Sequence, residues 1–424
     1  MPGSYSLGRG IKDFFTLCSG KIPGQIVIQF TDRCNASCPQ CDMNINNARD
    51  RYRLSNQVME EIIALAASRG IRSISFTGGE PFLYYEDLRH LIACAHQANI
   101  PFIRTGTNGF FLRKSESQEF ADKINKMAVE LAASGLRNLW ISIDSADPKI
   151  HEEIRGLPGV IKGIRHALPL FHAHGLYPAA NLGINRLTGG SNVESGLNPE
   201  DFLQQMKTSI SSFFEFVLDL GFTMANVCYP MSSEGNDDPH LLPVYGAHSA
   251  HSMVNFSQDE KILVFQALRE VVPSYRHRIR IFTPLSSLYA LEKQLQGESD
   301  FTFECRGGRD FFYISAFDNQ VYPCGYRGRE GLGSLDNLQP LANTSCRLCE
   351  WECFRDPSEL MGSMTSLLKP GAVYYKFKND PTYARYWWSD LKYYNACKFF
   401  DGRVEPSALK FRDTDWGNGI SAGV

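Results

Sequence analysis

Short apolar segments alternate strictly with longer helix-forming segments along the first half of the chain. Runs rich in β-branched and aromatic residues predict the strands, and helical patterns separate them. The predicted strands are residues 25–31, 73–77, 101–105, 138–144, 177–184 and 222–229, and the predicted helices are residues 55–68, 85–97, 118–133, 159–174 and 199–220. This order implies parallel strands joined by helical crossovers. Because no seventh or eighth unit is evident, we predict an α/β fold with an open, partial (β/α)6 barrel of the TIM type.

Chemically distinctive residues recur where these strands end. The first strand leads into a cysteine cluster, and the second leads into Gly78-Gly79-Glu80-Pro81. The third leads into Thr107 and Asn108, and Ser142 and Asp144 close the fourth. The carboxyl ends of the strands form the active-site face of a parallel barrel. We therefore expect all these residues to converge on one mouth.

The composition excludes several classes of protein. The chain has 424 residues and a formal net charge of −3, which gives no reason to expect nucleic acid or an anionic membrane as a partner. No apolar run approaches the roughly 18–20 residues that span a bilayer. The N-terminus lacks an apolar core of signal-peptide length, so we expect a cytoplasmic protein.

The twelve cysteines are unevenly distributed, and two groups of three stand out. They are Cys34, Cys38 and Cys41 near one end, and Cys346, Cys349 and Cys353 near the other. Clustered cysteines in an intracellular chain indicate metal or iron–sulfur ligands. Three thiolates on a 4Fe–4S cluster leave one iron open to an outside ligand. Zinc is the alternative occupant, but a structural zinc site needs a fourth protein ligand, and none lies nearby in sequence.

The spacing Cys34-x3-Cys38-x2-Cys41, in a loop after the first strand, closely resembles the radical S-adenosylmethionine (SAM) superfamily. The resemblance implies a 4Fe–4S cluster whose open iron is chelated by the amino and carboxylate groups of SAM. Gly78-Gly79-Glu80-Pro81 looks like the family's motif for the methionyl amino group. Gln40 replaces the aromatic residue that usually precedes the third cysteine. Its flat amide or a neighbouring side chain would then have to contact the adenine.

Further cofactor-binding residues follow from the same resemblance. Ser142 and Asp144 match the hydroxyl and carboxylate near the SAM ribose, and Arg155 matches a basic residue that pairs with the SAM carboxylate. A salt bridge on a helix surface is the alternative role for Arg155. Thr107 and Asn108, after the third strand, resemble the polar residues that lie under the cofactor in this family. Topology alone adds polar or adenine-contacting positions after the fifth and sixth strands: Asn181, Asn185, Arg186, Asn226 and Val227.

A second cysteine set resembles the SPASM/twitch extension, which holds auxiliary iron–sulfur clusters in many radical SAM enzymes. A hairpin-like stretch at residues 311–325 places Cys324 on its second strand and has Asn319 where the family usually has glycine. The shorter twitch pattern implies one auxiliary 4Fe–4S cluster on Cys305, Cys324, Cys346 and Cys349. Cys353 replaces one of these or is spare, and Cys397 is a distant sixth cysteine. A zinc knuckle is the main alternative.

The resemblance implies an enzyme that cleaves SAM to a 5′-deoxyadenosyl radical and removes a hydrogen atom from its substrate. An auxiliary cluster that accepts an electron favours net oxidation, either dehydrogenation or cross-linking, so we predict a radical SAM oxidoreductase or maturase. The expected partners are a small-molecule or peptide substrate and an electron donor such as flavodoxin or ferredoxin. Only about 24 residues precede the first strand, which favours a small molecule or an unfused peptide.

Two alternatives to oxidation remain open at this point. Cys228 lies near the end of the sixth strand, and an inward-facing thiol would return a hydrogen atom to the substrate, as an epimerase or peptide-modifying maturase requires. A non-catalytic iron–sulfur electron carrier is the other alternative, although it has no need of a SAM site.

The chain divides into five predicted regions. They are an N-terminal extension (1–24), the radical SAM partial barrel (25–230), a connecting loop and helices (231–300), the auxiliary-cluster domain (301–360) and an aromatic-rich C-terminal segment (361–424). In the last region, residues 372–394 predict a helix that packs across the body of the protein.

Overall fold

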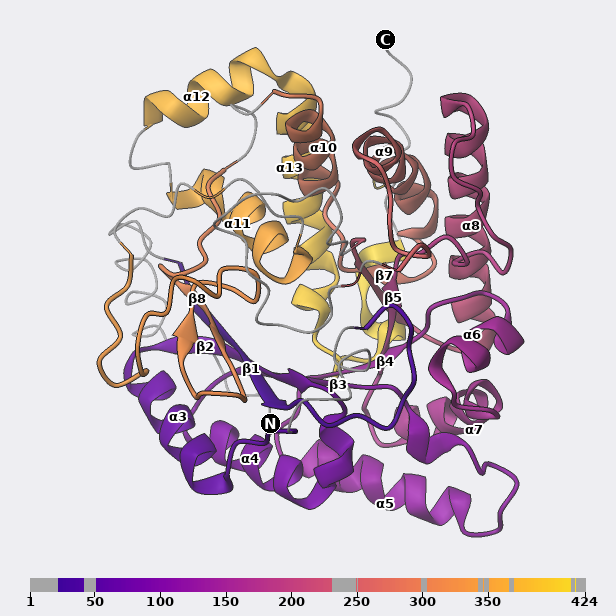
Figure 1. Ribbon diagram of the computed structural model, residues 1–424, viewed down its shortest axis with the longest axis vertical. Helices are drawn as coiled ribbons and strands as arrows, with labels where there is room; N and C mark the ends of the chain where they lie inside the picture. Colours follow the sequence, from indigo (N-terminus) through magenta and orange to yellow (C-terminus); the bar gives the residue numbers. More distant parts are fainter. Residues whose placement is uncertain are drawn as a thin grey trace.

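One open, curved sheet forms the centre of the molecule (Figure 1). The computed structural model describes residues 22–41, 51–230, 249, 251–298, 303–341, 346, 351–365, 370–412 and 416. Within these residues the sheet has nine strands in the order β7-β6-β5-β4-β3-β2-β1-β8-β9. All neighbouring strands pair in parallel except β8 and β9, which are antiparallel. The predicted α/β class and the unclosed barrel are confirmed.

The six predicted strands are present, and the sheet continues beyond them at both edges. The strands are β1 Gly24–Thr31, β2 Ile71–Gly78, β3 Phe102–Thr107, β4 Asn138–Ser142, β5 Ala179–Gly183, β6 Met224–Cys228, β7 Arg280–Ile281, β8 Phe311–Ile314 and β9 Val321–Tyr322. Strand β7 extends the β6 edge, and β8 pairs with β1. The cysteine-rich segment therefore adds its hairpin to the barrel sheet, and the boundaries of the five regions stay a prediction.

The helices alternate with the strands as the sequence predicts. They are α3 Asn56–Ser68, α4 Tyr85–Gln97, α5 Phe120–Ala133, α6 Pro148–Arg155, α7 Val160–Ala173, α8 Pro199–Leu220, α9 Gln258–Tyr275, α10 Leu285–Leu295, α11 Glu352–Thr365, α12 Pro370–Asn379 and α13 Pro381–Ala396, with short 3-10 turns η1 Pro81–Tyr84, η2 Phe110–Leu112, η5 Lys398–Phe400, η6 Pro406–Ala408 and η7 Lys410–Arg412. Side-chain caps fix several helix starts, because Ser55 and Asn198 each accept a hydrogen bond from the first turn.

Alternate residues of each strand face opposite sides of the sheet. On β1, the side chains of Ile26, Ile28 and Phe30 are fully buried in the main core beneath the outer helices. Val27 packs with Phe354 of α11, and Gln25 Nε2 donates to Cys353 O, so both face the side of the sheet on which α11 lies (Figure 1). A strand covered on both faces is apolar toward the helices and more polar toward the inside of the barrel.

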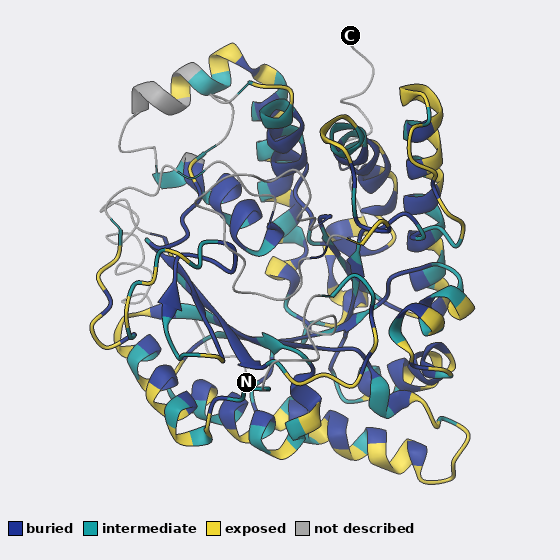
Figure 2. Ribbon diagram, viewed as in Figure 1, coloured by how far each residue is buried: buried dark blue, intermediate teal, exposed yellow. Residues whose placement is uncertain are grey.

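The C-terminal segment fills part of the concave side. Ala179 and Met224 of β5 and β6 pack in one buried cluster with Tyr393, Phe400 and Trp416. Figure 2 shows α11 and the sheet-facing side of α13 as largely buried. The predicted aromatic helix is confirmed as packing across the body, but it is two helices, α12 and α13, because Asp380 and a proline begin the second one. No helix among the described residues is long and apolar enough to cross a membrane.

Helix α11 is tied to the barrel by a buried carboxyl group whose titration we expect to affect stability. Asp356 accepts hydrogen bonds from the Tyr229 hydroxyl, at 2.9 and 3.1 Å, and from the Ser287 hydroxyl at 2.5 Å. Burial raises the pKa of Asp356 from 3.8 to about 8. The folded state therefore keeps a proton between pH 4 and pH 8 that the unfolded chain releases, so Asp356 stabilises the fold less as pH rises.

We expect the free energy of unfolding to fall by about 2 kcal/mol more between pH 6 and pH 8 in the wild type than in Asp356→Asn. Urea unfolding at several pH values measures this difference, because all other titrating groups are shared by the two proteins. Parallel stability curves would exclude Asp356 as the source of the pH dependence.

Candidate functional site

The first three cysteines lie in one loop that follows β1. Cys38 is buried, Cys41 is partly exposed and Cys34 is exposed. Burial is the main reason that the pKa of the Cys38 thiol is raised to about 12; the Arg155 guanidinium opposes this rise, and Asp144 and the two neighbouring thiols add to it. Arg155 would therefore offset part of the negative charge of the thiolates when they bind a cluster.

A zinc ion and a 4Fe–4S cluster need different arrangements of thiolate ligands. Zinc–sulfur bonds of about 2.3 Å bring the sulfurs around one ion to within about 4 Å of one another. Among the described residues, the potential ligand groups whose atoms all lie within 4.8 Å of one another do not include this cysteine loop. They comprise Glu60, His90 and Cys94, on the outer helices α3 and α4. Three thiols in one loop suit a 4Fe–4S cluster that leaves one iron to an external ligand.

Two glycines at the end of β2 allow the cysteine loop to pack closely. Gly79 donates a hydrogen bond to Thr31 O at 2.7 Å, and Glu80 N donates to Arg33 O at 2.8 Å. A Cβ on Gly79 would stand 2.1 Å from Arg33 O, and one on Gly78, whose φ is +128°, would stand 2.0 Å from Thr31 O. Both positions therefore require glycine so that the motif can contact the backbone that carries the cysteines.

The Glu80 carboxylate joins the ends of β2 and β3. It accepts hydrogen bonds from Thr107 Oγ1 at 2.9 Å, from Asn108 N at 2.6 Å and from Phe82 N at 3.0 Å. Burial raises its pKa to about 7. The Asn108 amide in turn donates to Asn35 Oδ1 at 2.9 Å and lies 3.8 Å from Cys34 Sγ. The predicted group Glu80, Thr107 and Asn108 is thus one hydrogen-bonded unit beside the first cysteine.

Asp144 and Arg155 form a two-bond ion pair on the other side of the cysteine loop. Arg155 Nε and Nη2 donate to Asp144 at 2.7 and 2.9 Å, and Arg155 O accepts from Ser37 N at 2.9 Å. Gln40 Nε2 also donates to Asp144, at 3.3 Å, while Gln40 Oε1 is buried with no hydrogen bond to the described residues. The amide that replaces the usual aromatic residue therefore lies beside the predicted ribose-binding group with one acceptor unused.

The remaining positions near the mouth divide between the two faces of the sheet. On the concave side, Cys228 Sγ lies 3.5 Å from Asn181 Oδ1, which also accepts from Asn226 Nδ2 at 2.8 Å. Val227 points the other way, because its side chain is fully buried in the helix-facing core. Only its backbone is left for a cofactor.

Two more predicted positions beyond β5 make structural contacts. Asn185 Nδ2 donates to Asp144 O at 2.8 Å, which holds the strand that carries this carboxylate. Arg186 is buried in an ion pair with Glu260, with Arg186 Nη2 2.7 Å from Glu260 Oε2. Ser142, at the end of β4, is partly exposed and pairs in register with Asn181.

Three of the predicted auxiliary-cluster cysteines lie close together. Cys305 N donates to Cys346 O at 3.0 Å, and the pKa of the Cys324 thiol is raised, by burial first and then by the nearby Cys305 and Cys346. Cys349 lies outside the described residues. Cys324 follows β9 by two residues instead of lying on it, and Asn319 has the expected left-handed φ of 57°. Neighbouring thiols of this kind are the ligands that an iron–sulfur cluster takes.

The other C-terminal cysteines face elsewhere. Burial raises the pKa of the Cys353 thiol, the nearby Glu352 and Asp356 raise it as well, and Arg104 lowers it. Cys353 Sγ donates to Glu352 Oε1 at 3.3 Å. Cys397 is fully buried in the cluster under β5 and β6 that contains Tyr393. The sequence analysis did not single out Glu352 or Arg104. An arginine in the middle of an otherwise uncharged strand, residues 102–107, was the available signal.

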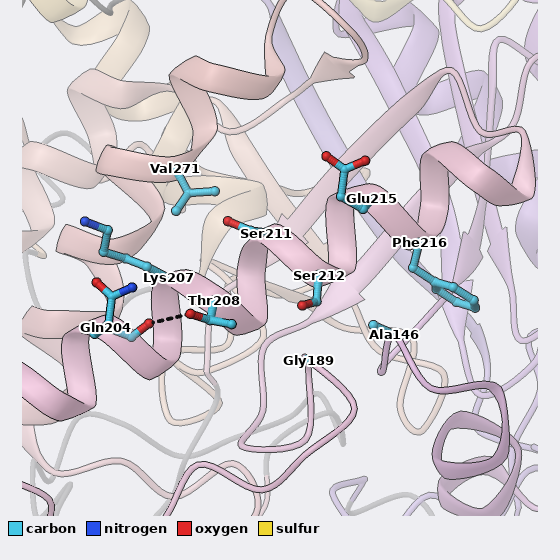
Figure 3. Close-up of a pocket in the computed structure, with 10 residues that line it drawn as sticks. All are labelled: Ala146, Gly189, Gln204, Lys207, Thr208, Ser211, Ser212, Glu215, Phe216 and Val271. Atoms are coloured by element: carbon cyan, nitrogen blue, oxygen red, sulfur yellow. Dashed lines mark hydrogen bonds between the residues drawn. The ribbon is translucent and has the colours of Figure 1, made fainter.

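A surface hollow lies apart from all these residues. Figure 3 shows its lining on α8, α9 and two loops. The lining residues are Ala146, Gly189, Gln204, Lys207, Thr208, Ser211, Ser212, Glu215, Phe216 and Val271. None of the sequence-predicted site residues belongs to this hollow, so we do not assign it to the cofactor.

Comparisons with known proteins agree with this site. Residues 28–194 match the model of the Radical SAM superfamily, so the chain carries a radical SAM domain. That family binds SAM and a 4Fe–4S cluster, which confirms the cofactor prediction for the barrel.

Two curated relatives come from species of Methanosarcina. A "Probable GTP 3',8-cyclase" of Methanosarcina mazei is 32% identical over 150 residues, which are 33% of this chain and 40% of the relative's length. An "AdoMet-dependent heme synthase" of Methanosarcina barkeri is 24% identical over 80% of this chain and 87% of its own length. The match to the first relative therefore spans well under half of that protein.

Solved structures of similar arrangement include SuiB of Streptococcus suis bound to S-adenosylmethionine, at 18% identity and a TM-score of 0.46, over 75% of this chain and 64% of that one. Another is anSMEcpe with bound AdoMet, at 14% identity and a TM-score of 0.47, over 89% of this chain and 100% of that one.

Proposed function

We propose that this protein is a radical SAM enzyme that removes a hydrogen atom from its substrate and completes a net oxidation, either a dehydrogenation or a cross-link. The observation that carries the proposal is the meeting of three spaced thiols, Glu80 and the Asp144–Arg155 pair at the carboxyl ends of β1 to β4. A 4Fe–4S cluster on these thiolates supplies the electron that splits SAM into methionine and a 5′-deoxyadenosyl radical.

The residues around the cysteine loop bind and orient SAM in this proposal. The Glu80 carboxylate, already held by three donors, faces the methionyl amino group. Arg155 faces the SAM carboxylate, and Asp144 accepts from the ribose hydroxyls. Gln40 Oε1 supplies an acceptor for the adenine amine. Groups fixed in this way hold the reacting centre without further reorganisation and keep water away from it.

The oxidation half of the proposal rests on the second cysteine set. In this proposal Cys305, Cys324 and Cys346, together with Cys349, would hold an auxiliary 4Fe–4S cluster, and such a cluster would supply an electron acceptor for the substrate radical. The support is that Cys305, Cys324 and Cys346 pack together with Val27 of β1, the strand that leads into the first cysteine loop.

SAM cleavage tests the proposed activity. Anaerobically reconstituted protein with dithionite and SAM is expected to release 5′-deoxyadenosine, which liquid chromatography quantifies. The triple variant of Cys34, Cys38 and Cys41 to alanine should release none, and Cys94→Ala, on α4 outside the sheet, serves as the matched control. Equal release by the triple variant would refute the assignment.

A second candidate is supported by the orientation of Cys228. Its thiol faces the concave side beside Asn181, where a substrate radical would form, so it is placed to return a hydrogen atom in an epimerisation. Turnover in deuterated water distinguishes the two reactions. Net oxidation predicts a product lighter by two hydrogens and no deuterium incorporation. Epimerisation predicts one deuterium in the product, lost in Cys228→Ala, and incorporation that persists in this variant would exclude Cys228.

A further inference from the structure

An arginine and a glutamate lie inside the barrel without an oppositely charged partner among the residues that the structure describes. Arg104 is on β3, and its Nη2 donates to Gln25 Oε1 at 3.2 Å. Its Nε is buried and makes no hydrogen bond. In the part of the chain that the structure describes, no ion pair involves Arg104, so its charge meets only a neutral amide.

Glu352, the first residue of α11, is the negative counterpart. Glu352 is buried, with only 6% of the residue exposed. Oε1 accepts from the Cys353 thiol at 3.3 Å, whereas Oε2 is buried and accepts no hydrogen bond. Within the described ranges no lysine or arginine forms an ion pair with this carboxylate.

A single glutamine holds the two charges near each other without pairing them. Gln25 accepts from Arg104 and donates from Nε2 to Cys353 O at 2.5 Å, so β1 connects the arginine to the start of α11. The Cys228 thiol on β6 contacts the Glu352 carboxylate from the other side. Strands β1, β3 and β6 and helix α11 thus all contribute to one polar interior.

Burying an unpaired charge costs several kcal/mol of folding free energy. Two unpaired charges of opposite sign in one interior therefore destabilise the fold unless a ligand pairs with both of them. A ligand with one carboxylate and one ammonium group satisfies the fork of Arg104 and the free oxygen of Glu352, and it brings no net charge into the barrel. We propose that the barrel interior binds an amino acid as a zwitterion, with its carboxylate on Arg104 and its ammonium on Glu352.

The position of this pair fits the proposed function, on which its role as a substrate site rests. Arg104 is on the same strand as Thr107, which hydrogen-bonds Glu80 at the mouth. Asn181, which contacts Cys228, pairs in register with Ser142 at the end of β4. An amino acid held between Arg104 and Glu352 therefore lies on the concave side of the strands whose ends carry the proposed SAM site, and a free amino acid fits it better than a peptide with blocked termini.

Binding can be tested separately from chemistry. The probes are the twenty proteinogenic L-amino acids, each with its methyl ester, which lacks the carboxylate, and its N-acetyl derivative, which lacks the ammonium. Saturation-transfer NMR with reconstituted protein, SAM and no reductant identifies the binders, and isothermal titration gives their affinities. We expect at least one free amino acid to bind about tenfold or more tightly than either of its derivatives.

The variants then assign each charge. Arg104→Gln should weaken binding of the amino acid by about tenfold or more but leave the affinity for its methyl ester unchanged. Glu352→Gln should weaken binding of the amino acid but leave the affinity for the N-acetyl derivative unchanged. Arg104→Lys should recover part of the affinity. Exposed residues of the same charge, in Arg113→Gln and Glu153→Gln, are the controls. Thermal unfolding checks that each variant is folded.

Failure of this inference is distinguishable from failure of the proposed function. The zwitterion site is refuted if no amino acid binds the wild type, or if Arg104→Gln and Glu352→Gln bind the amino acid as tightly as the wild type does. Either result refutes the site even where 5′-deoxyadenosine is released. Selective binding of peptides that contain a lysine and an acidic residue, with no free amino acid bound, would also overturn it. Charge-dependent binding without SAM cleavage would support the site and refute the activity.

Discussion

Replacing Cys34, Cys38 and Cys41 together with alanine is expected to lower the iron content from about eight atoms per chain to about four, with SAM cleavage lost completely. Each 4Fe–4S cluster contributes about four irons, and the two cysteine sets are separate: the first follows the end of β1, whereas Cys305, Cys324 and Cys346 belong to another packed cluster. The cluster left on the second set is fully bound by protein thiolates if four cysteines engage. It therefore has no open iron for SAM. Iron and sulfide analysis after anaerobic reconstitution measures the change.

The complementary variant supplies the control. Cys305→Ser with Cys324→Ser should also leave about four irons, but with SAM cleavage retained and oxidised product lost. The paramagnetic resonance signal of reduced protein should shift on SAM addition in this variant and stay unchanged in the triple variant. About four irons in the wild type, with zinc present, would refute the auxiliary cluster.

A wild-type iron content near twelve would mean a third cluster that uses Cys353 and Cys397. The structure argues against it, because Cys353 faces Glu352 whereas Cys397 is buried among the aromatic residues under β5 and β6.

The barrel was predictable from sequence because its signals are local. Each strand is a short apolar run, and each crossover helix has an amphipathic pattern, so six strands fall within a few residues of their predicted ends. Helix α6 was missed because its eight residues lie directly before α7. Strand β8 was expected only as part of a hairpin. Its pairing with β1 joins residues nearly 290 apart, and no local pattern reports such a contact.

The candidate site divides in the same way. The cysteine spacing and Gly78-Gly79-Glu80-Pro81 are readable in sequence because each motif is contiguous. That Gln40 reaches Asp144 depends on how two loops meet across 104 residues. The interior pair, Arg104 and Glu352, is further from prediction, because one residue belongs to the barrel and the other begins a helix 248 positions later that lies on the concave face. Charges brought together by tertiary packing leave only a weak trace in sequence, such as an isolated arginine in a strand.

The buried junction of α13 with the barrel should be the most sensitive point of the fold to a single substitution. Asp390 and Arg276 are both fully buried, and Arg276 Nη2 lies 2.8 Å from Asp390 Oδ1. Asp390 also accepts from Leu285 N at 3.1 Å, and from Ser286 N and Ser286 Oγ at 2.8 and 2.7 Å, at the start of α10. One carboxylate thus joins α9, α10 and α13 by four hydrogen bonds.

Asp390→Ala is expected to lower the free energy of unfolding by about 3–5 kcal/mol, because it leaves the Arg276 guanidinium buried without its counter-charge and three donors of α10 without an acceptor. Urea unfolding of the reconstituted protein, followed by far-ultraviolet circular dichroism, measures the loss. Asp219→Ala is the matched control, since Asp219 pairs with Arg165 on the surface, where both side chains are about half exposed or more. That change should cost less than about 1 kcal/mol. If both variants lost the same small amount, α13 would not depend on the buried pair, and its docking would have to rest on the aromatic packing of Tyr393 against Phe400 and Trp416.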